Sequence, residues 1–199
     1  MKNIVFSLLV LFSVTVSGQK TKKQPLIEFQ PDFRFGIQVP SHSGTNFFSN
    51  DMDSNIGIQS TLSLAKVKNF RLTMGYDFYQ LKLKNKEALG NFSQINMKTI
   101  LFMLEYEKKF NKLYSLSPTL SIGFSDLNYV NQGMILAVQH GNEIKAGAYG
   151  SISLNKTFAA FAGLHYAHYF NSNLSATQEN KDYFGKSNKI VFSVGIQIH

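Results

Sequence analysis

The sequence contains no cysteine and no tryptophan. Without cysteine there is no disulfide framework, so a secreted chain of this size must be stabilised by a packed core or by a membrane. The absence of cysteine after the first apolar run also excludes a lipoprotein anchor. No segment after Gly18 approaches 18 uninterrupted apolar residues, which excludes a transmembrane helix there. Helices and closed barrels are the structures that satisfy every backbone polar group in lipid, so a membrane protein with this sequence must be a β-barrel.

The start of the chain has the pattern of a secretory signal peptide. Lys2 supplies the positive charge, Ile4–Val16 the apolar run, and Val16-Ser17-Gly18 the small residues that signal peptidase requires. The run is too short for a stable membrane-spanning helix. We therefore expect cleavage after Gly18, a basic periplasmic lead-in over residues 19–31 and a single domain over residues 32–199.

The formal net charge of +8 does not indicate a nucleic-acid partner. Eighteen of the twenty basic residues are lysines, and they are scattered over turns and loops without forming a helical stripe. We interpret the charge as solvated turns that also attract anionic lipid headgroups.

The stretch Tyr114–Ser125 carries the clearest structural signal. Apolar and small polar residues alternate over its whole length, and only an extended strand sends alternate side chains to opposite faces. Its polar face holds serine, threonine and glycine without any charge, which suits a narrow barrel interior better than a surface in water. Its length is sufficient to cross the hydrocarbon layer, since a tilted strand needs about 9–11 residues.

The same alternation recurs in seven further segments, and the connections between the eight alternate between long and short. The predicted strands are Asp32–Val39, Asn55–Ala65, Phe70–Leu83, Ile95–Glu107, Tyr114–Ser125, Glu143–Leu154, Phe158–Phe170 and Ile190–Ile198. The predicted long loops are Pro40–Ser54, Lys84–Gln94, Asp126–Asn142 and Asn171–Lys186. The predicted fold is therefore an all-β, eight-stranded antiparallel up-and-down transmembrane barrel with short periplasmic turns and four long outer loops.

Two segments depart from the simple pattern. The apolar parity changes after Tyr79, which indicates a β-bulge near Tyr79-Gln80. Within the third long loop, Met134–Val138 is expected to extend a strand above the membrane.

Aromatic residues near the strand ends fit two interfacial girdles. The periplasmic girdle contains Phe33, Phe70, Tyr106, Tyr114 and Phe158, and the outer girdle contains Phe78, Phe124, Tyr166 and Tyr169. With these girdles, the strand pattern and the closing apolar series Ile190–Ile198, the region Asp32–His199 resembles the small eight-stranded outer-membrane barrels, the OmpX-like group and the transmembrane domain of OmpA.

This resemblance implies a bacterial outer-membrane location, contact with outer-membrane lipid and lipopolysaccharide, and insertion by the barrel-assembly machinery, which reads the last strand. Family members commonly end that strand in an aromatic residue, whereas this chain ends in Ile198-His199. The resemblance also implies a non-enzymatic scaffold without a cofactor, whose loops contact an unidentified partner outside the cell.

Two other interpretations fit parts of the sequence. A soluble lipocalin-like ligand-binding barrel has similar strands, but its apolar face points inward and its Gly-x-Trp signature needs a tryptophan. A lipid A deacylase-like esterase requires a serine two residues from a histidine near an outer strand end, with an acid to orient the histidine. His168, Ser172 and Glu179 supply the residue types, but Phe170 stands where that serine should be.

The histidines do not form a predicted metal site. His165 and His168 are three residues apart, which places them on opposite faces of a strand. His42 and His140 lie in separate predicted loops, and no carboxylate cluster accompanies any of the four. We therefore predict neither a metal ligand nor a catalytic residue.

The two arginines of the chain, Arg34 and Arg71, both fall on the inward parity near the periplasmic end. Glu105 and Glu107 descend to the same end on the inward parity of their strand. An unpaired charge in a narrow lumen costs several kcal/mol, and the planar guanidinium can grip a carboxylate with two hydrogen bonds. We predict that Arg71 pairs with Glu105 or Glu107, that Arg34 joins them, and that this cluster plugs the lumen and fixes the strand register.

Overall fold

In the computed structural model of the chain, the described residues are Ile27, Phe29 and residues 31–84, 92–171 and 178–199. The predicted signal peptide lies outside them. The long strands are β1 (Phe33–Ser43), β3 (Gly57–Val67), β4 (Phe70–Leu83), β5 (Gln94–Tyr106), β7 (Tyr114–Asn131), β8 (Met134–Ser153), β9 (Phe158–Phe170) and β10 (Lys186–Ile198). The shorter elements are α2 (Phe47–Asn50), β2 (Met52–Ser54), β6 (Lys108–Lys109) and α4 (Gln178–Gly185).

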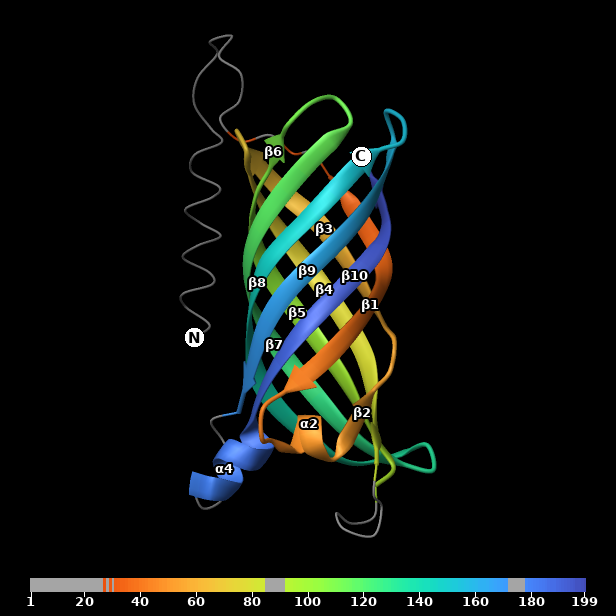
Figure 1. Cartoon of the computed structure of the whole chain (residues 1–199), viewed down its shortest axis with the longest axis vertical. Helices are drawn as coiled ribbons and strands as arrows, with labels where there is room; N and C mark the ends of the chain where they lie inside the picture. Colours follow the sequence, from red (N-terminus) through yellow and green to blue (C-terminus); the bar gives the residue numbers. More distant parts are fainter. Residues whose placement is uncertain (1–26, 28, 30, 85–91, 172–177) are drawn as a thin grey trace.

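Within the described residues, the eight long strands form a closed antiparallel ring. Long strands that follow one another in the chain are neighbours, and the ring closes where β1 pairs with β10, from Phe33 opposite Ile198 to Ser43 opposite Asn188. The strands slope across the barrel axis (Figure 1), as closure of a sheet requires. The predicted eight-stranded up-and-down barrel is confirmed.

The two ends of the barrel differ. The turn end, at the top of Figure 1, contains the short turns at residues 68–69, 110–113 and 154–157 together with His199. The loop end, at the bottom of the same view, contains α2, β2, α4 and the tip of the hairpin between β7 and β8. No helix in the described segments is long and apolar enough to cross a membrane.

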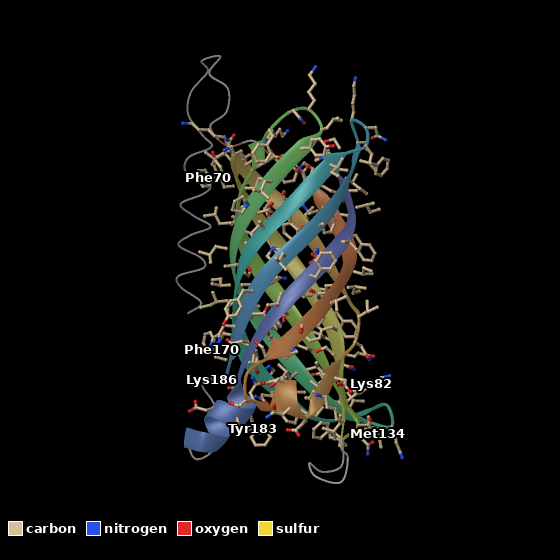
Figure 2. The ribbon with its side chains drawn as sticks, in the orientation of Figure 1. Phe70, Lys82, Met134, Phe170, Tyr183 and Lys186 are labelled. Atoms are coloured by element: carbon tan, nitrogen blue, oxygen red, sulfur yellow. The ribbon has the colours of Figure 1, made fainter. Side chains whose placement is uncertain are left out.

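Apolar side chains cover the outside of the barrel. On β1, Phe35 and Ile37 are 46% and 47% exposed, whereas Arg34 and Gln38 are 3% and 1% exposed. Figure 2 shows side chains projecting outward along the whole wall. Further exposed apolar residues are Leu72, Met74, Phe102, Leu104, Leu120, Ile122, Leu164, Phe192 and Ile196. A lipocalin-like barrel would bury this face, so that interpretation is wrong.

The predicted aromatic girdles are largely present on this outer surface. All five aromatic residues predicted for the periplasmic girdle are exposed at the turn end, and Phe124 and Tyr166 are exposed near the loop end. Tyr169 was assigned to the outer girdle wrongly, because it points into the barrel and is 1% exposed.

The loop end of the lumen is closed by an apolar plug. The side chain of Asn46 caps α2 by accepting a hydrogen bond from the Ser49 N–H at 3.2 Å, and α2 places Phe47 and Phe48 inside the barrel mouth, each 1% exposed. The apolar plug consists of Phe47, Phe48, Met52, Tyr79, Leu81, Leu83, Ile95, Met97, Leu127 and Tyr169. The predicted first long loop is thus partly a packed insertion.

The plug explains why the predicted bulge near Tyr79-Gln80 is wrong. β4 pairs with β5 in one unbroken register along its length. Tyr79 and Leu81 continue the inward parity of β4, and they are apolar because they belong to the plug. The irregularity lies in β3 instead, where the register shifts between Ser63 and Ala65.

The predicted third long loop, Asp126–Asn142, consists mainly of strand. β7 and β8 continue to a tight turn at Gln132 and Gly133, whose φ angles of 48° and 82° are positive, as the turn of a two-residue hairpin requires. The predicted strand extension at Met134–Val138 is confirmed. Figure 2 shows Met134 at the loop end, beyond the wall of the barrel.

Candidate functional site

Buried ion pairs cross the lumen between the turn end and the apolar plug. Toward the turn end, Arg34 of β1 reaches Glu105 of β5. Its Nη1 and Nη2 atoms donate to the two carboxylate oxygens at 2.8 and 2.9 Å, and its Nε donates to Oε1 of Gln197 at 3.0 Å. The guanidinium also lies 4.7 Å from the ring centroid of Tyr149. This paired contact is the geometry that the planar arginine fork favours.

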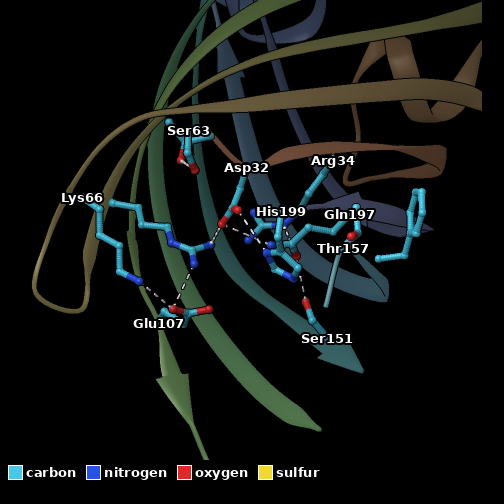
Figure 3. Close-up of polar contacts among 12 residues, drawn as sticks. Asp32, Arg34, Ser63, Lys66, Glu107, Ser151, Thr157, Gln197 and His199 are labelled. Atoms are coloured by element: carbon cyan, nitrogen blue, oxygen red, sulfur yellow. Dashed lines mark hydrogen bonds and ion pairs between the residues drawn. The ribbon is translucent and has the colours of Figure 1, made fainter. Parts of the chain in front are cut away.

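Arg71 of β4 lies at the same end and contacts two carboxylates. Its Nη1 is 2.5 Å from Oδ2 of Asp32, and its Nη2 is 3.0 Å from Oε2 of Glu107. Lys66 Nζ lies 3.5 Å from Glu107, and His199 Nδ1 lies 3.0 Å from Asp32. Figure 3 shows these carboxylates between their partners. We define the turn-end cluster as Asp32, Arg34, Arg71, Glu105 and Glu107.

The structure therefore brings the four predicted lumen residues to one end of the barrel. Arg71 contacts Glu107, while Glu105 is taken by Arg34 from across the lumen. Asp32 completes the cluster and was not predicted from the sequence. The available signal was its position two residues before Arg34, on the same inward parity.

Two further ion pairs lie deeper in the lumen. Lys145 Nζ is 2.7 Å from Asp77 Oδ2, and Lys189 Nζ is 2.6 Å from Glu143 Oε2. Lys189 also donates to the hydroxyl of Tyr79 at 2.7 Å, which joins this pair to the apolar plug. Neither pair was predicted from the sequence. Lys145 and Asp77 each lie between outward-facing apolar or aromatic neighbours, whereas an asparagine precedes both Glu143 and Lys189.

These contacts fill the lumen with compensated charge. Every charged group in the two deeper pairs is 5% exposed or less. Removing one member of such a pair leaves its partner uncompensated, which is strongly destabilising in a place shielded from water. An eight-stranded barrel has an interior just wide enough for side chains to fill, so these residues and the plug occupy the space that a larger barrel would use as a channel.

The residues considered for ester hydrolysis are not assembled in the described part of the chain. His168 Nδ1 lies 2.7 Å from Oδ1 of Asn188. Ser172 lies outside the described residues, as does the side chain of Glu179. Of the three candidate residues, only His168 has a described side chain.

A serine–histidine contact does occur beneath the plug. His42 Nδ1 lies 2.6 Å from Oγ of Ser187, and the imidazole stacks on Phe48 with ring centroids 5.5 Å apart. Nε2 of His42 has no hydrogen-bond partner among the described residues. A hydrolytic triad needs an acid to orient the imidazole, and none contacts this partly buried pair among the described residues.

No group of three or more metal-ligating side chains occurs among the described residues. His165 faces the lumen, where its Nε2 lies 3.1 Å from Oγ1 of Thr119. His168 lies on the opposite face of β9, as its spacing from His165 requires.

The tip of the β7–β8 hairpin exposes apolar side chains beyond the barrel. Met134 and Ile135 are 65% and 59% exposed, and Leu136 and Val138 are also exposed. Within the hairpin, the hydroxyl of Tyr129 donates to Oε1 of Gln139 at 2.6 Å. Burial raises the pKa of Tyr129 to about 12.

Removing one arginine of the turn-end cluster tests its structural role. Arg34→Ala leaves Glu105 buried without its guanidinium, and we expect a loss of about 3–5 kcal/mol in stability. The readout is the temperature at which the folded band disappears on a detergent gel. The double variant Arg34→Ala/Glu105→Ala removes both charges and should recover part of the loss. An Arg71→Ala variant that resists heat and detergent as well as the parent does would contradict the role of the cluster.

Comparison with known proteins shows which solved structures share this fold. No protein-family model and no curated protein matches the chain. Neisserial surface protein A (NspA) is similar in structure with a TM-score of 0.56 at 10% sequence identity, over 86% of this chain and 97% of that chain. The outer membrane protein OprG from Pseudomonas aeruginosa is similar with a TM-score of 0.58 at 12% identity, over 86% and 96% of the two chains. The chain therefore has the fold of the small eight-stranded outer-membrane β-barrels.

Proposed function

We propose that this chain is a non-enzymatic protein of the bacterial outer membrane that acts as a surface scaffold or interaction protein through its loop end. The observation that carries the proposal is the β7–β8 hairpin, which projects beyond the barrel and exposes Met134, Ile135 and Leu136. Soluble surfaces rarely present contiguous apolar side chains unless they contact a partner. The filled lumen supports the same assignment, because it leaves the ends of the barrel as the surfaces available for function.

The outer surface of the barrel supports the membrane location. Its apolar band suits lipid, and exposed aromatic residues lie toward both ends of that band. Short turns at one end and longer connections at the other are typical of outer-membrane barrels, and they support an orientation with the turn end in the periplasm and the loop end outside. Exposed Lys82 and Lys98 lie toward the loop end, where they suit the anionic groups of lipopolysaccharide. The predicted signal peptide and insertion by the barrel-assembly machinery fit the same location.

Single cysteines test the location and the orientation, because the natural chain contains none. Met134→Cys places a thiol at the exposed hairpin tip, and Lys156→Cys places one in an exposed turn at the turn end. In intact cells, we expect a membrane-impermeant maleimide to label the first variant and to label the second after the outer membrane is permeabilised. Equal labelling of both variants in intact cells would contradict the orientation. Recovery of the protein in the periplasm without detergent would contradict the location.

The interaction role is tested at the hairpin tip. A photo-crosslinking residue at Asn131 should give a discrete higher-mass adduct on intact cells in contact with the partner. We expect the triple variant Met134→Ser/Ile135→Ser/Leu136→Ser to lose the adduct while it folds normally, since exposed substitutions usually change stability by less than about 0.5 kcal/mol.

The matched control for the hairpin is Asp182→Asn/Lys186→Gln, which alters an exposed ion pair of 2.6 Å at a different site of the loop end. This control should keep the adduct. An adduct that survives the triple serine variant, or no adduct from the unaltered hairpin, would rule out the hairpin as the interaction surface.

A further inference from the structure

The turn end of the barrel contains a cavity of about 780 Å³ whose lining includes five cationic side chains together with apolar and neutral polar residues. Its cationic lining residues are Lys66, Arg71, Lys109, Lys112 and Lys156, and Asp32 and His199 also line it. Asp32 and Arg71 belong to the buried turn-end cluster, so the cavity lies at the mouth of the lumen and not on the lipid-facing wall. Its volume is within the roughly 300–1,000 Å³ of typical ligand sites.

Two of these lysines are held by identical turns. Asn111 Oδ1 accepts hydrogen bonds from the backbone N–H groups of Leu113 and Tyr114, both at 2.8 Å. Lys112 therefore lies inside a turn that the preceding asparagine closes, which is a common role of asparagine.

The second turn repeats this arrangement. Asn155 Oδ1 accepts from the N–H groups of Thr157 and Phe158, again at 2.8 Å, and Lys156 occupies the same position as Lys112. A backbone hydrogen bond of 2.8 Å from the Ser153 N–H to the Leu113 carbonyl ties the second turn to the first. The two lysine backbones are thereby fixed beside one cavity.

The side-chain carboxylates of Asp32 and Glu107 are already engaged by cationic groups, whereas Lys112 and Lys156 have no ion-pair partner among the described residues. Glu107 contacts Arg71 at 3.0 Å, Lys66 at 3.5 Å and Lys109 at 3.9 Å. Within the part of the chain that the structure describes, no carboxylate lies within 4.0 Å of the Nζ atoms of Lys112 or Lys156. The mouth of the lumen therefore carries uncompensated positive charge, which favours a ligand with several negative charges.

Apolar side chains adjoin the charge. Leu113 and Leu154 also line the cavity, and they are 53% and 64% exposed. A simple phosphate ion makes no use of such walls. An extended peptide that alternates carboxylates with aliphatic groups suits both the lysines and the leucines.

We propose that the turn end is a binding site for an acidic peptide segment, with Lys112 and Lys156 contacting its carboxylates and Leu113 and Leu154 its aliphatic groups. The periplasmic side of this site rests on the orientation proposed above. Binding itself is a property of the purified barrel, so a test in detergent succeeds or fails independently of any partner of the hairpin.

The test uses the folded full-length barrel in a zwitterionic detergent and a fluorescent hexapeptide of alternating glutamate and leucine. Fluorescence anisotropy should show binding that weakens as salt is added, because exposed charges are screened. Lys112→Gln/Lys156→Gln should weaken binding roughly fivefold, since each exposed lysine–carboxylate contact contributes modestly. A hexapeptide with glutamine in place of glutamate should also bind the parent protein weakly. Its affinity should be no higher than that of the acidic peptide for the double variant.

Lys82→Gln/Lys98→Gln is the matched control, because it removes the same charge from exposed lysines toward the loop end. It should leave the affinity unchanged, and both double variants should keep the heat-shifted band of the folded barrel. Equal weakening by both double variants would mean that binding depends on net charge alone, which would contradict the proposed site. Inorganic pyrophosphate bound as tightly as the peptide would overturn the assignment to a peptide, and equal binding of the glutamine peptide would overturn the role of the lysines.

Discussion

The pairing of β1 with β10 is the constraint on which the rest of the structure depends. It joins the first and last long strands over eleven paired positions, from Phe33 opposite Ile198 to Ser43 opposite Asn188. A sheet closed in this way has no edge, so its backbone donors and acceptors are satisfied within the wall. For that reason the wall can face lipid, with phenylalanine, leucine and isoleucine side chains exposed on its outer surface.

Closure also makes the lumen narrow, and its contents follow from that limit. A buried charge is costly without a partner, and Arg34, Arg71, Lys145 and Lys189 each contact a carboxylate from a distant part of the chain. Toward the loop end, α2 supplies Phe47 and Phe48 and the lining becomes apolar. Because the interior is filled in both regions, the interaction surfaces that we propose lie at the ends of the described barrel, on the projecting hairpin and at the basic mouth of the turn end.

The strands could be predicted from the sequence because a wall between lipid and a polar interior imposes a period of two. That inference fails where the interior changes. Tyr79 and Leu81 are apolar and inward, so the parity switch resembled a bulge although the backbone is regular. The alternation also predicts that a charged side chain faces the lumen, but it does not predict which residue that side chain contacts. Lys145 and Asp77, for example, are 68 residues apart in the chain and meet across the lumen. Such pairs depend on barrel closure and strand register, which a single sequence does not encode locally.

Hydrogen–deuterium exchange of the folded protein in detergent or lipid tests barrel closure most directly. If β1 and β10 are paired as described, their ladder amides should exchange as slowly as those between β4 and β5, which lie within the wall. Fast exchange confined to the facing edges of β1 and β10, with slow exchange elsewhere, would mean that the sheet is open and would contradict the closed barrel.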